Sequence, residues 1–169
     1  ITLSSLVADN QLYSPSVLVL DEQMRPAAYY PASYFTYEKA GIMTSDRLQG
    51  VMKLTPALGQ KQIYLLVYTT REDLAKTTKL LDPAKAYAMG VGNAVPDIPD
   101  PIAKHTPTGN LKIKATAEQG MGNVMIGLIQ SAPASPPVVV GSPQTAAVAA
   151  PAPAPVKPAE PMLSETENY

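Results

Sequence analysis

The distribution of proline divides this chain into two parts that must fold differently. The chain has 169 residues and eighteen prolines, which is about twice the usual share. Nine of these prolines lie between Ser131 and Pro161, with nine alanines and only two charged residues. Each proline removes a backbone donor and fixes one φ angle, so this stretch cannot build regular sheet or long helix. The pattern predicts a folded domain at residues 1–130 and a Pro/Ala-rich linker at residues 131–161.

We expect the linker to be an extended tether. Pro151 to Pro155 alternates proline with alanine, which favours polyproline II. At about 3.1 Å per residue, the whole linker would span on the order of 95 Å if it were fully extended. The acidic residues after Ser164 suit the start of a helix. We therefore interpret residues 162–169 as the start of a C-terminal helical segment that is cut short at Tyr169.

The composition excludes several kinds of chemistry. There is no cysteine, which excludes disulfides, thiolate zinc sites, Fe–S clusters and cysteine nucleophiles. His105 is the single histidine, so chemistry that needs two imidazoles is excluded. Thirteen Lys and Arg residues against 14 Asp and Glu residues give a net charge of -1, without the clustered positive charge of a nucleic-acid-binding protein. No apolar run reaches membrane-spanning length, and we expect no metal or cofactor.

Short apolar and alternating segments predict an all-β fold for the first part. We expect strands at residues 1–7, 17–20, 28–37, 48–55, 63–68, 111–115 and 124–129. Residues 17–20 are apolar on both faces, which is typical of a central strand, whereas Pro31 marks an edge or an interruption. Seven short strands with one helical excursion predict a β-sandwich, of which the jelly roll is one arrangement.

The helical excursion is predicted from its capping residues. Thr70, with Asp73 three residues later, is close to a capping box. The residues that then fall at helical spacing are Leu74, Thr77, Thr78 and Leu81. Asp82 and Pro83 form a second N-cap and N1 pair, which predicts a short helix over 84–89 that ends at Gly90. Residues 91–110 contain four prolines and are expected to form a long ordered loop.

Three groups of polar residues invite a functional interpretation but have a simpler one. His105, in the predicted loop, is either a lone acid–base group or, more commonly, a solvated histidine. Asp97 and Asp100 either act as an acid–base pair or calcium ligands, or stiffen turns beside their prolines. The motif Gly90-Val91-Gly92 begins like a dinucleotide fingerprint, yet it lacks the third glycine and follows no predicted strand. We interpret this motif as a helix end and a turn.

A cluster of aromatic residues is the sharpest local feature. Half of the ten aromatic side chains lie between positions 29 and 37. Aromatic rings can stack on the C–H faces of sugars, while phenol groups bond to hydroxyls. The alternative is that these rings fill the core, and adjacent Tyr29 and Tyr30 cannot both face inward on a regular strand. The candidate carbohydrate-binding residues are Tyr29, Tyr30, Tyr34 and Tyr37.

Long stretches of the chain resemble one family. They are Val17–Asp21, Tyr34–Tyr37, Gly50–Gln60, Leu80–Ala88, Val95–Pro101 and, after the Pro/Ala tail, Pro161–Leu163. These residues resemble the maltose-operon periplasmic protein family of enteric bacteria. The resemblance implies a precursor with a signal sequence, export to the periplasm and production alongside the maltodextrin uptake system. It supplies neither a reaction nor a site residue that can be transferred by position.

The leading hypothesis is therefore a non-enzymatic periplasmic accessory protein of maltose and maltodextrin uptake. It would bind an oligosaccharide or a component of the transport machinery. The alternative is a structural or scaffolding protein that binds only other envelope proteins. A glycosidase normally needs two carboxylates across a cleft, and no pair among the 14 acidic residues stands out by its spacing. We expect no catalytic activity.

Overall fold

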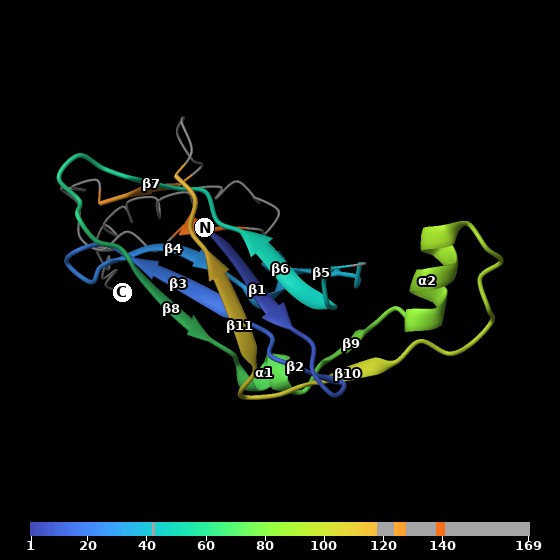
Figure 1. Cartoon of the computed structure of the whole chain (residues 1–169). Coiled ribbons are helices and arrows are strands. Elements are labelled where there is room, and N and C mark those ends of the chain that lie inside the picture. Colours follow the sequence, from blue (N-terminus) through green and yellow to red (C-terminus); the bar gives the residue numbers. More distant parts are fainter. Residues whose placement is uncertain (42, 118–123, 128–137, 141–169) are drawn as a thin grey trace, which may run out of the picture.

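The structure is a computed structural model that describes residues 1–41, 43–117, 124–127 and 138–140. Two of its sheets have four strands each (Figure 1). The first has the antiparallel order β11-β1-β6-β5, formed by β1 (Thr2–Leu6), β5 (Thr36–Glu38), β6 (Arg47–Val51) and β11 (Asn110–Lys114). The second has the order β13-β4-β3-β8, formed by β3 (Ser16–Leu20), β4 (Pro26–Tyr30), β8 (Tyr64–Tyr68) and β13 (Val138–Val139).

Two smaller sheets complete the described strands. One has the order β2-β10-β9, formed by β2 (Gln11–Leu12), β9 (Thr77–Lys79) and β10 (Ile102–His105). The other is a parallel pair, formed by β7 (Leu54–Pro56) and β12 (Val124–Ile126). In Figure 1 the three-stranded sheet leads from the sandwich towards helix α2 (Pro83–Val91).

The core is built from the inward positions of the two four-stranded sheets. Leu3 and Leu48 come from the first sheet, and Val17, Val19 and Tyr30 come from the second, all within one apolar cluster. Val17 and Val19 are completely buried, and Val17 lies opposite Tyr30 in the ladder. Strand β3 lies between β4 and β8, so its prediction as a central strand is confirmed. The all-β sandwich is confirmed with it.

The tyrosine-rich run crosses from one sheet to the other. It was predicted as one strand with an edge or a break at Pro31, and the break is what the structure contains. After β4, a 3-10 helix η1 (Ala32–Tyr34) turns the chain, and the Tyr34 N–H donates to the Pro31 carbonyl at 2.9 Å. Strand β5 then joins the opposite sheet beside β6. Because proline offers no ladder donor, the chain leaves the second sheet at this residue.

A glycine allows this crossing to pack closely on β6. A Cβ added at Gly50 would lie 2.7 Å from Cδ1 of Phe35 and 3.1 Å from Cδ1 of Tyr34. Phe35 and Gly50 are both buried. Any side chain at position 50 would therefore push the two aromatic rings away from the sheet.

The helix caps were predicted correctly, but the length of the first helix was not. The Asp73 N–H donates to the Thr70 hydroxyl at 3.0 Å, yet helix α1 (Arg71–Leu74) has only four residues. The predicted continuation is wrong, because residues 77–79 form strand β9 and pair with β10. In α2, the Ala84 N–H donates to the Asp82 carboxylate at 2.8 Å. This helix ends at Gly92, which has a φ of 74°, rather than at Gly90.

The predicted loop at 91–110 is corrected in part, because residues 102–105 form β10. The remaining excursion, residues 82–101, contains α2 and projects from the sandwich as an arm (Figure 1). Its base is closed by a bond of 2.9 Å from the Leu80 N–H to the Pro101 carbonyl. The Asp100 carboxylate also pairs with Lys85 at 3.1 Å and with Lys79 at 3.3 Å. Asp100 therefore holds the two ends of the arm together.

The predicted linker and C-terminal segment lie outside the described residues, except for 138–140. Val138 and Val139 pair in parallel with β4, and the Val140 N–H donates to the Tyr29 carbonyl at 2.8 Å. The boundaries at 1–130, 131–161 and 162–169 remain predictions. Within the part of the chain that the structure describes, no helix is long and apolar enough to cross a membrane.

Candidate functional site

The four candidate tyrosines are separated by the fold. Tyr30 faces the core and is 1% exposed, so its ring is closed to a ligand. Tyr34 stacks edge-on against Tyr30, with ring centroids 4.8 Å apart, and its hydroxyl donates to the Val51 carbonyl. Tyr29 lies on the outer side of β4, since its neighbour in the strand points inward. Of the four, Tyr29 is the one on an outer sheet face.

Tyr37 has a structural task that occupies its hydroxyl. The hydroxyl donates to the Asp46 carboxylate and accepts from the Leu81 N–H at 2.9 Å. Burial, and then the bond to Asp46, raise the pKa of Tyr37 to about 12. The hydroxyl therefore ties β5 to the loop before β6 and to the root of the arm, rather than facing a ligand.

The outer side of the second sheet carries an apolar, aromatic surface, which we call the aromatic face. In the ladder, Leu18 lies opposite both Tyr29 on β4 and Leu66 on β8. Tyr64 and Tyr68 share the side of Leu66, because side chains alternate along a strand. The aromatic face is Leu18, Tyr29, Tyr64, Leu66 and Tyr68. Leu66 is 52% exposed and Tyr64 is 39% exposed, so part of this face meets solvent.

Two phenols approach each other across the aromatic face. Burial, and then the adjacent phenol of Tyr29, raise the pKa of Tyr68. The hydroxyl of Tyr64 donates to Gln62 Oε1 at 3.2 Å. The face thus combines ring surfaces with polar groups at its margin, a combination suited to amphipathic ligands.

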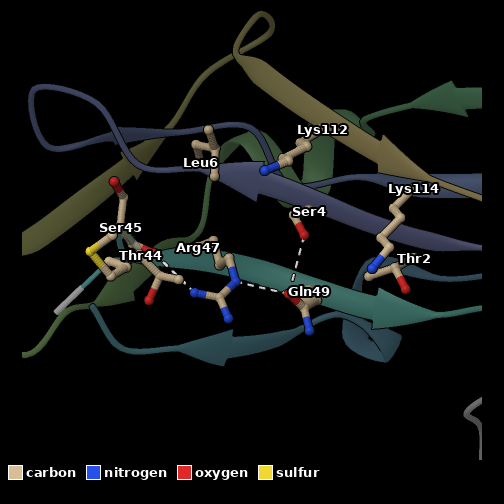
Figure 2. A pocket seen from close by; sticks show the side chains of 10 residues that line it. Thr2, Ser4, Leu6, Thr44, Ser45, Arg47, Gln49, Lys112 and Lys114 are labelled. Carbon is tan, nitrogen blue, oxygen red and sulfur yellow. Dashed lines mark hydrogen bonds between the residues drawn. The ribbon is translucent and has the colours of Figure 1, made fainter. Parts of the chain in front are cut away.

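The outer side of the first sheet is polar and contains a hollow. A hollow of about 330 Å³ lies over β1, β6 and β11 (Figure 2). We call it the basic hollow, and it is lined by Thr2, Ser4, Leu6, Met43, Thr44, Ser45, Arg47, Gln49, Lys112 and Lys114. In the ladder, Ser4 lies between Gln49 and Lys112, while Thr2 lies opposite Lys114. Three strands therefore present a continuous row of outward polar side chains.

The floor of the basic hollow is ordered by hydrogen bonds. Arg47 donates from Nε to Gln49 Oε1 at 2.8 Å and from Nη1 to the Ser45 carbonyl at 3.2 Å. The Ser4 hydroxyl donates to the same Gln49 oxygen at 3.2 Å. Figure 2 shows these contacts joining β1, β6 and the loop before β6. They fix the guanidinium of Arg47 in one orientation at the bottom of the hollow.

The lining of the basic hollow, as the described residues form it, contains three cations and no carboxylate. The nearby carboxylate of Asp46 is engaged elsewhere, by the Tyr37 hydroxyl and the Ala40 N–H. Glu38 lies opposite Arg47 in the ladder, but within the described residues it forms no ion pair with it. The hollow is consequently a local concentration of positive charge on a chain with a net charge of -1.

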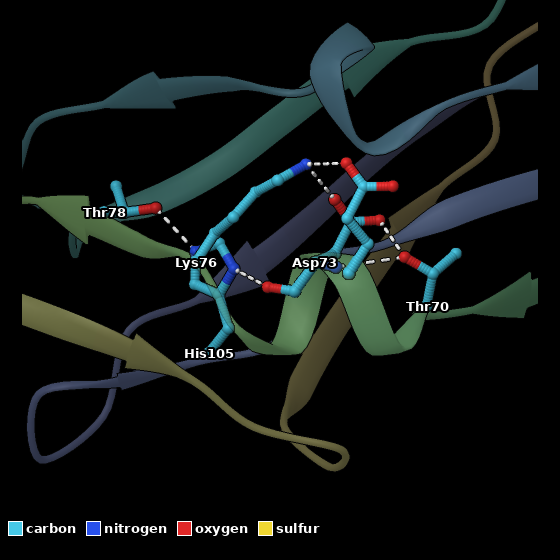
Figure 3. Close-up of polar contacts among 6 residues, drawn as sticks. Thr70, Asp73, Lys76, Thr78 and His105 are labelled. Carbon is cyan, nitrogen blue, oxygen red and sulfur yellow. Dashed lines mark hydrogen bonds and ion pairs between the residues drawn. The ribbon is translucent and has the colours of Figure 1, made fainter.

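His105 lies in strand β10, and its interpretation as a solvated loop residue is corrected. Its Nδ1 is 2.6 Å from the Asp73 carbonyl and its Nε2 is 2.8 Å from the Thr78 hydroxyl (Figure 3). Because a carbonyl can only accept, Nδ1 carries a hydrogen, and in the neutral imidazole Nε2 then accepts from the Thr78 hydroxyl. The imidazole thereby links β10, β9 and α1.

The contacts of Asp73 also point to a structural role for this cluster. Its carboxylate accepts from the Thr70 hydroxyl at 2.6 Å and from Lys76 at 2.9 Å. Burial of Asp73 opposes its ionisation, but the bonds from Thr70 and Lys76 outweigh burial and lower its pKa. A hydroxyl on an imidazole is the start of a nucleophile–base arrangement, yet the described hollow lies on another sheet. Among the described residues, no group of three acidic or histidine side chains is placed to hold a metal ion.

Neither surface was predicted from the sequence, although a signal for both was present. Residues two or four positions apart share a face of a strand, as Lys112 and Lys114 do, or Tyr64 and Tyr68. This spacing shows that each pair points the same way. It does not show which way, because that depends on the strand partners.

The chain is similar to one family of curated proteins. The family model described as "Maltose operon periplasmic protein precursor" matches residues 1–115. The chain is 55% identical over 170 residues to the maltose operon periplasmic protein of Escherichia coli (strain K12), and 52% identical to that of Salmonella typhimurium (strain LT2). Each alignment covers all of this chain and 55% of the relative, so the chain spans about half the length of the curated relatives it matches. No solved structure matches it.

Proposed function

The chain belongs to the maltose operon periplasmic protein family and is periplasmic, and on that basis we propose that it is a non-enzymatic accessory protein of maltodextrin uptake. In this proposal the aromatic face is the carbohydrate-binding surface. The observation that carries it is the row of Tyr64, Leu66 and Tyr68 on β8, with Tyr29 of β4 on the other side of Leu18.

The spacing of these rings suits a ligand made of repeated sugar units. Residues two apart on a strand are about 6.6 Å apart, so Tyr64 and Tyr68 are separated by ~13 Å along β8. Rings at that separation would contact different units of an oligosaccharide. Leu66 between them gives a continuous apolar surface for the C–H faces, and the phenol groups offer hydrogen bonds to hydroxyls.

The aromatic face is a better candidate for a neutral sugar than the basic hollow. Among the described residues, no aromatic side chain lines the hollow, and its three cations have no counterpart in an uncharged maltodextrin. Neither surface, as the described residues form it, contains a pair of carboxylates. Retaining and inverting glycosidases normally use such a pair, which supports binding without hydrolysis.

Isothermal titration with maltose to maltoheptaose would test the carbohydrate site. We expect binding by the unmodified chain and a several-fold loss of affinity in Tyr64→Ala and in Tyr68→Ala, since one stacking ring contributes on the order of 1 kcal/mol. Tyr87→Ala is the matched control, because Tyr87 is 70% exposed on the arm. Chromatography of the same mixtures should recover the maltodextrins intact. Full affinity in both folded β8 variants would contradict the proposal.

The arm favours a second candidate function, a structural role in which only other envelope proteins are bound. Tyr87, Met89 and Val91 on α2 are 70%, 49% and 51% exposed. Apolar side chains gathered on one projecting element are typical of a protein contact. If the unmodified chain binds no maltodextrin, this alternative replaces the carbohydrate-binding proposal.

A further inference from the structure

We propose that the basic hollow binds a small ligand that carries a phosphate group. The proposal is independent of the maltodextrin site, because the two surfaces lie on opposite sides of the sandwich and share no residue. It rests on the arrangement of cations, on the hydroxyl donors between them and on the absence of carboxylates from the described lining.

The three cations surround one strand. Lys112 and Lys114 come from β11 on one side of β1, and Arg47 comes from β6 on the other side. Neighbouring strands are about 4.8 Å apart, so β11 and β6 are separated by ~10 Å. Arg47 lies opposite Leu6, so in register it is two residues from Lys112 and four residues from Lys114, which adds ~7 Å and ~13 Å along the strands. The long side chains of Arg47 and Lys112 can therefore reach one ligand, and Lys114 adds positive charge at the far end of the hollow. Figure 2 shows Lys112 and Lys114 extending from β11 over β1.

The donors between the cations suit a tetrahedral anion. Thr2 lies on the intervening strand, and Thr44 and Ser45 lie at the end of the hollow beside Arg47, whereas the Ser4 hydroxyl already donates to Gln49. Arg47 has five N–H donors, of which the bonds to Gln49 and Ser45 occupy two. A phosphate offers several acceptor oxygens and up to two negative charges, and guanidinium and hydroxyl donors match both.

The positive charge of the basic hollow favours binding of an anion. Three positive charges that share one surface repel each other, and an anion would relieve that repulsion. Asp46 precedes Arg47 in the chain, and its carboxylate accepts from the Tyr37 hydroxyl and the Ala40 N–H. Glu38 lies opposite Arg47 in the ladder, and within the described residues it forms no ion pair with it. A volume of about 330 Å³ is at the lower end of the range for small-molecule pockets. Its size therefore favours a small soluble phosphate compound.

The experiment uses the full chain and three phosphate sources. Inorganic phosphate and glucose 1-phosphate are titrated by calorimetry, with glucose as the uncharged counterpart. Vesicles of phosphatidylglycerol are compared with phosphatidylcholine vesicles by co-sedimentation. We expect one of the phosphate sources to bind, glucose not to bind at the hollow, and binding to weaken as sodium chloride is raised, because exposed charges are screened.

Variants assign the binding to the hollow. We expect the double variant Lys112→Gln/Lys114→Gln to lose tenfold or more in phosphate affinity. Lys104→Gln, which removes one charge from an exposed position on β10, should lose little, and so should Tyr64→Ala. Binding only to the phosphatidylglycerol vesicles, lost in the double variant, would identify the phosphate as a lipid headgroup. An equal loss in Lys104→Gln, or no binding of any of the three sources, would overturn the proposal.

Discussion

The two outer faces of the sandwich cover the same core and have opposite chemistry. Strand β1 alternates inward-facing Leu3 and Ser5 with Thr2, Ser4 and Leu6, which line the basic hollow. Strand β8 instead places apolar side chains on both of its sides. The inward positions of both sheets form one apolar cluster, so the requirements of folding do not explain the difference. The outward positions are where the two sheets differ, and ligand preference would be determined there.

The largest effect is expected on β4, where Tyr30 points into the core and its neighbour Tyr29 points to the outer face. Tyr30 is 1% exposed, so Tyr30→Ala should lower the free energy of unfolding by about 3–5 kcal/mol. Tyr29→Ala changes the aromatic face and should cost on the order of 1 kcal/mol. Urea denaturation of both variants measures the difference. Similar losses in the two variants would show that the aromatic face is part of the core.

A smaller effect is expected under the first sheet, at Gly50. The Cβ of Gly50→Ala would meet the ring of Phe35 at 2.7 Å, so this variant should be destabilised by about 1–3 kcal/mol. Gly90→Ala is the matched control, because nothing lies within 4 Å of a Cβ at this helical position. Alanine there should be neutral or stabilise by up to about 1 kcal/mol. Thermal unfolding compares the two substitutions, and equal melting temperatures would refute the close contact.

The smallest expected effect concerns the hydroxyl of Tyr37, on the inner side of the first sheet, at alkaline pH. Burial, followed by the Asp46 bond, raises the pKa of Tyr37 from 10.0 to about 12. The folded state therefore keeps this proton where the unfolded state has lost it. The contribution to stability is complete below pH 10.0 and is lost as the pH rises through about 12.

Tyr37→Phe has no phenol to ionise, so its stability should fall less steeply over that range. Comparison of the variant with the unmodified chain cancels the titration of the lysines, and urea midpoints across the range give the two slopes. Parallel slopes would mean that Tyr37 does not contribute.

The features that could be predicted from the sequence are those that depend on contacts between residues close together in the chain. The caps at Thr70 and Asp82 depend on residues two or three positions away, and both are present. The interruption at Pro31 depends on the proline itself. The sandwich class followed from the number and spacing of apolar segments, because seven short strands cannot bury their faces in any simpler way.

Features that depend on distant partners were not predicted. Residues 77–79 have helical spacing, but β10 pairs with them from more than twenty positions away. His105 was placed in a loop because neither strand of that pair was recognised. The basic hollow combines outward positions of three strands, and the aromatic run did not reveal that Tyr29 joins the tyrosines of β8 rather than its own neighbours. Strand register is the missing information in each case.

The closed base of the arm makes residues 82–101 an exchangeable module. Its two ends already meet through the Leu80–Pro101 bond and the pairing of Lys79 with Ile102. Each doubling of a loop with joined ends costs only about 0.6 kcal/mol in chain entropy. Insertions or substitutions in the arm would therefore leave the sandwich nearly untouched. The binding partner of the arm can therefore change during evolution independently of the two sheet faces.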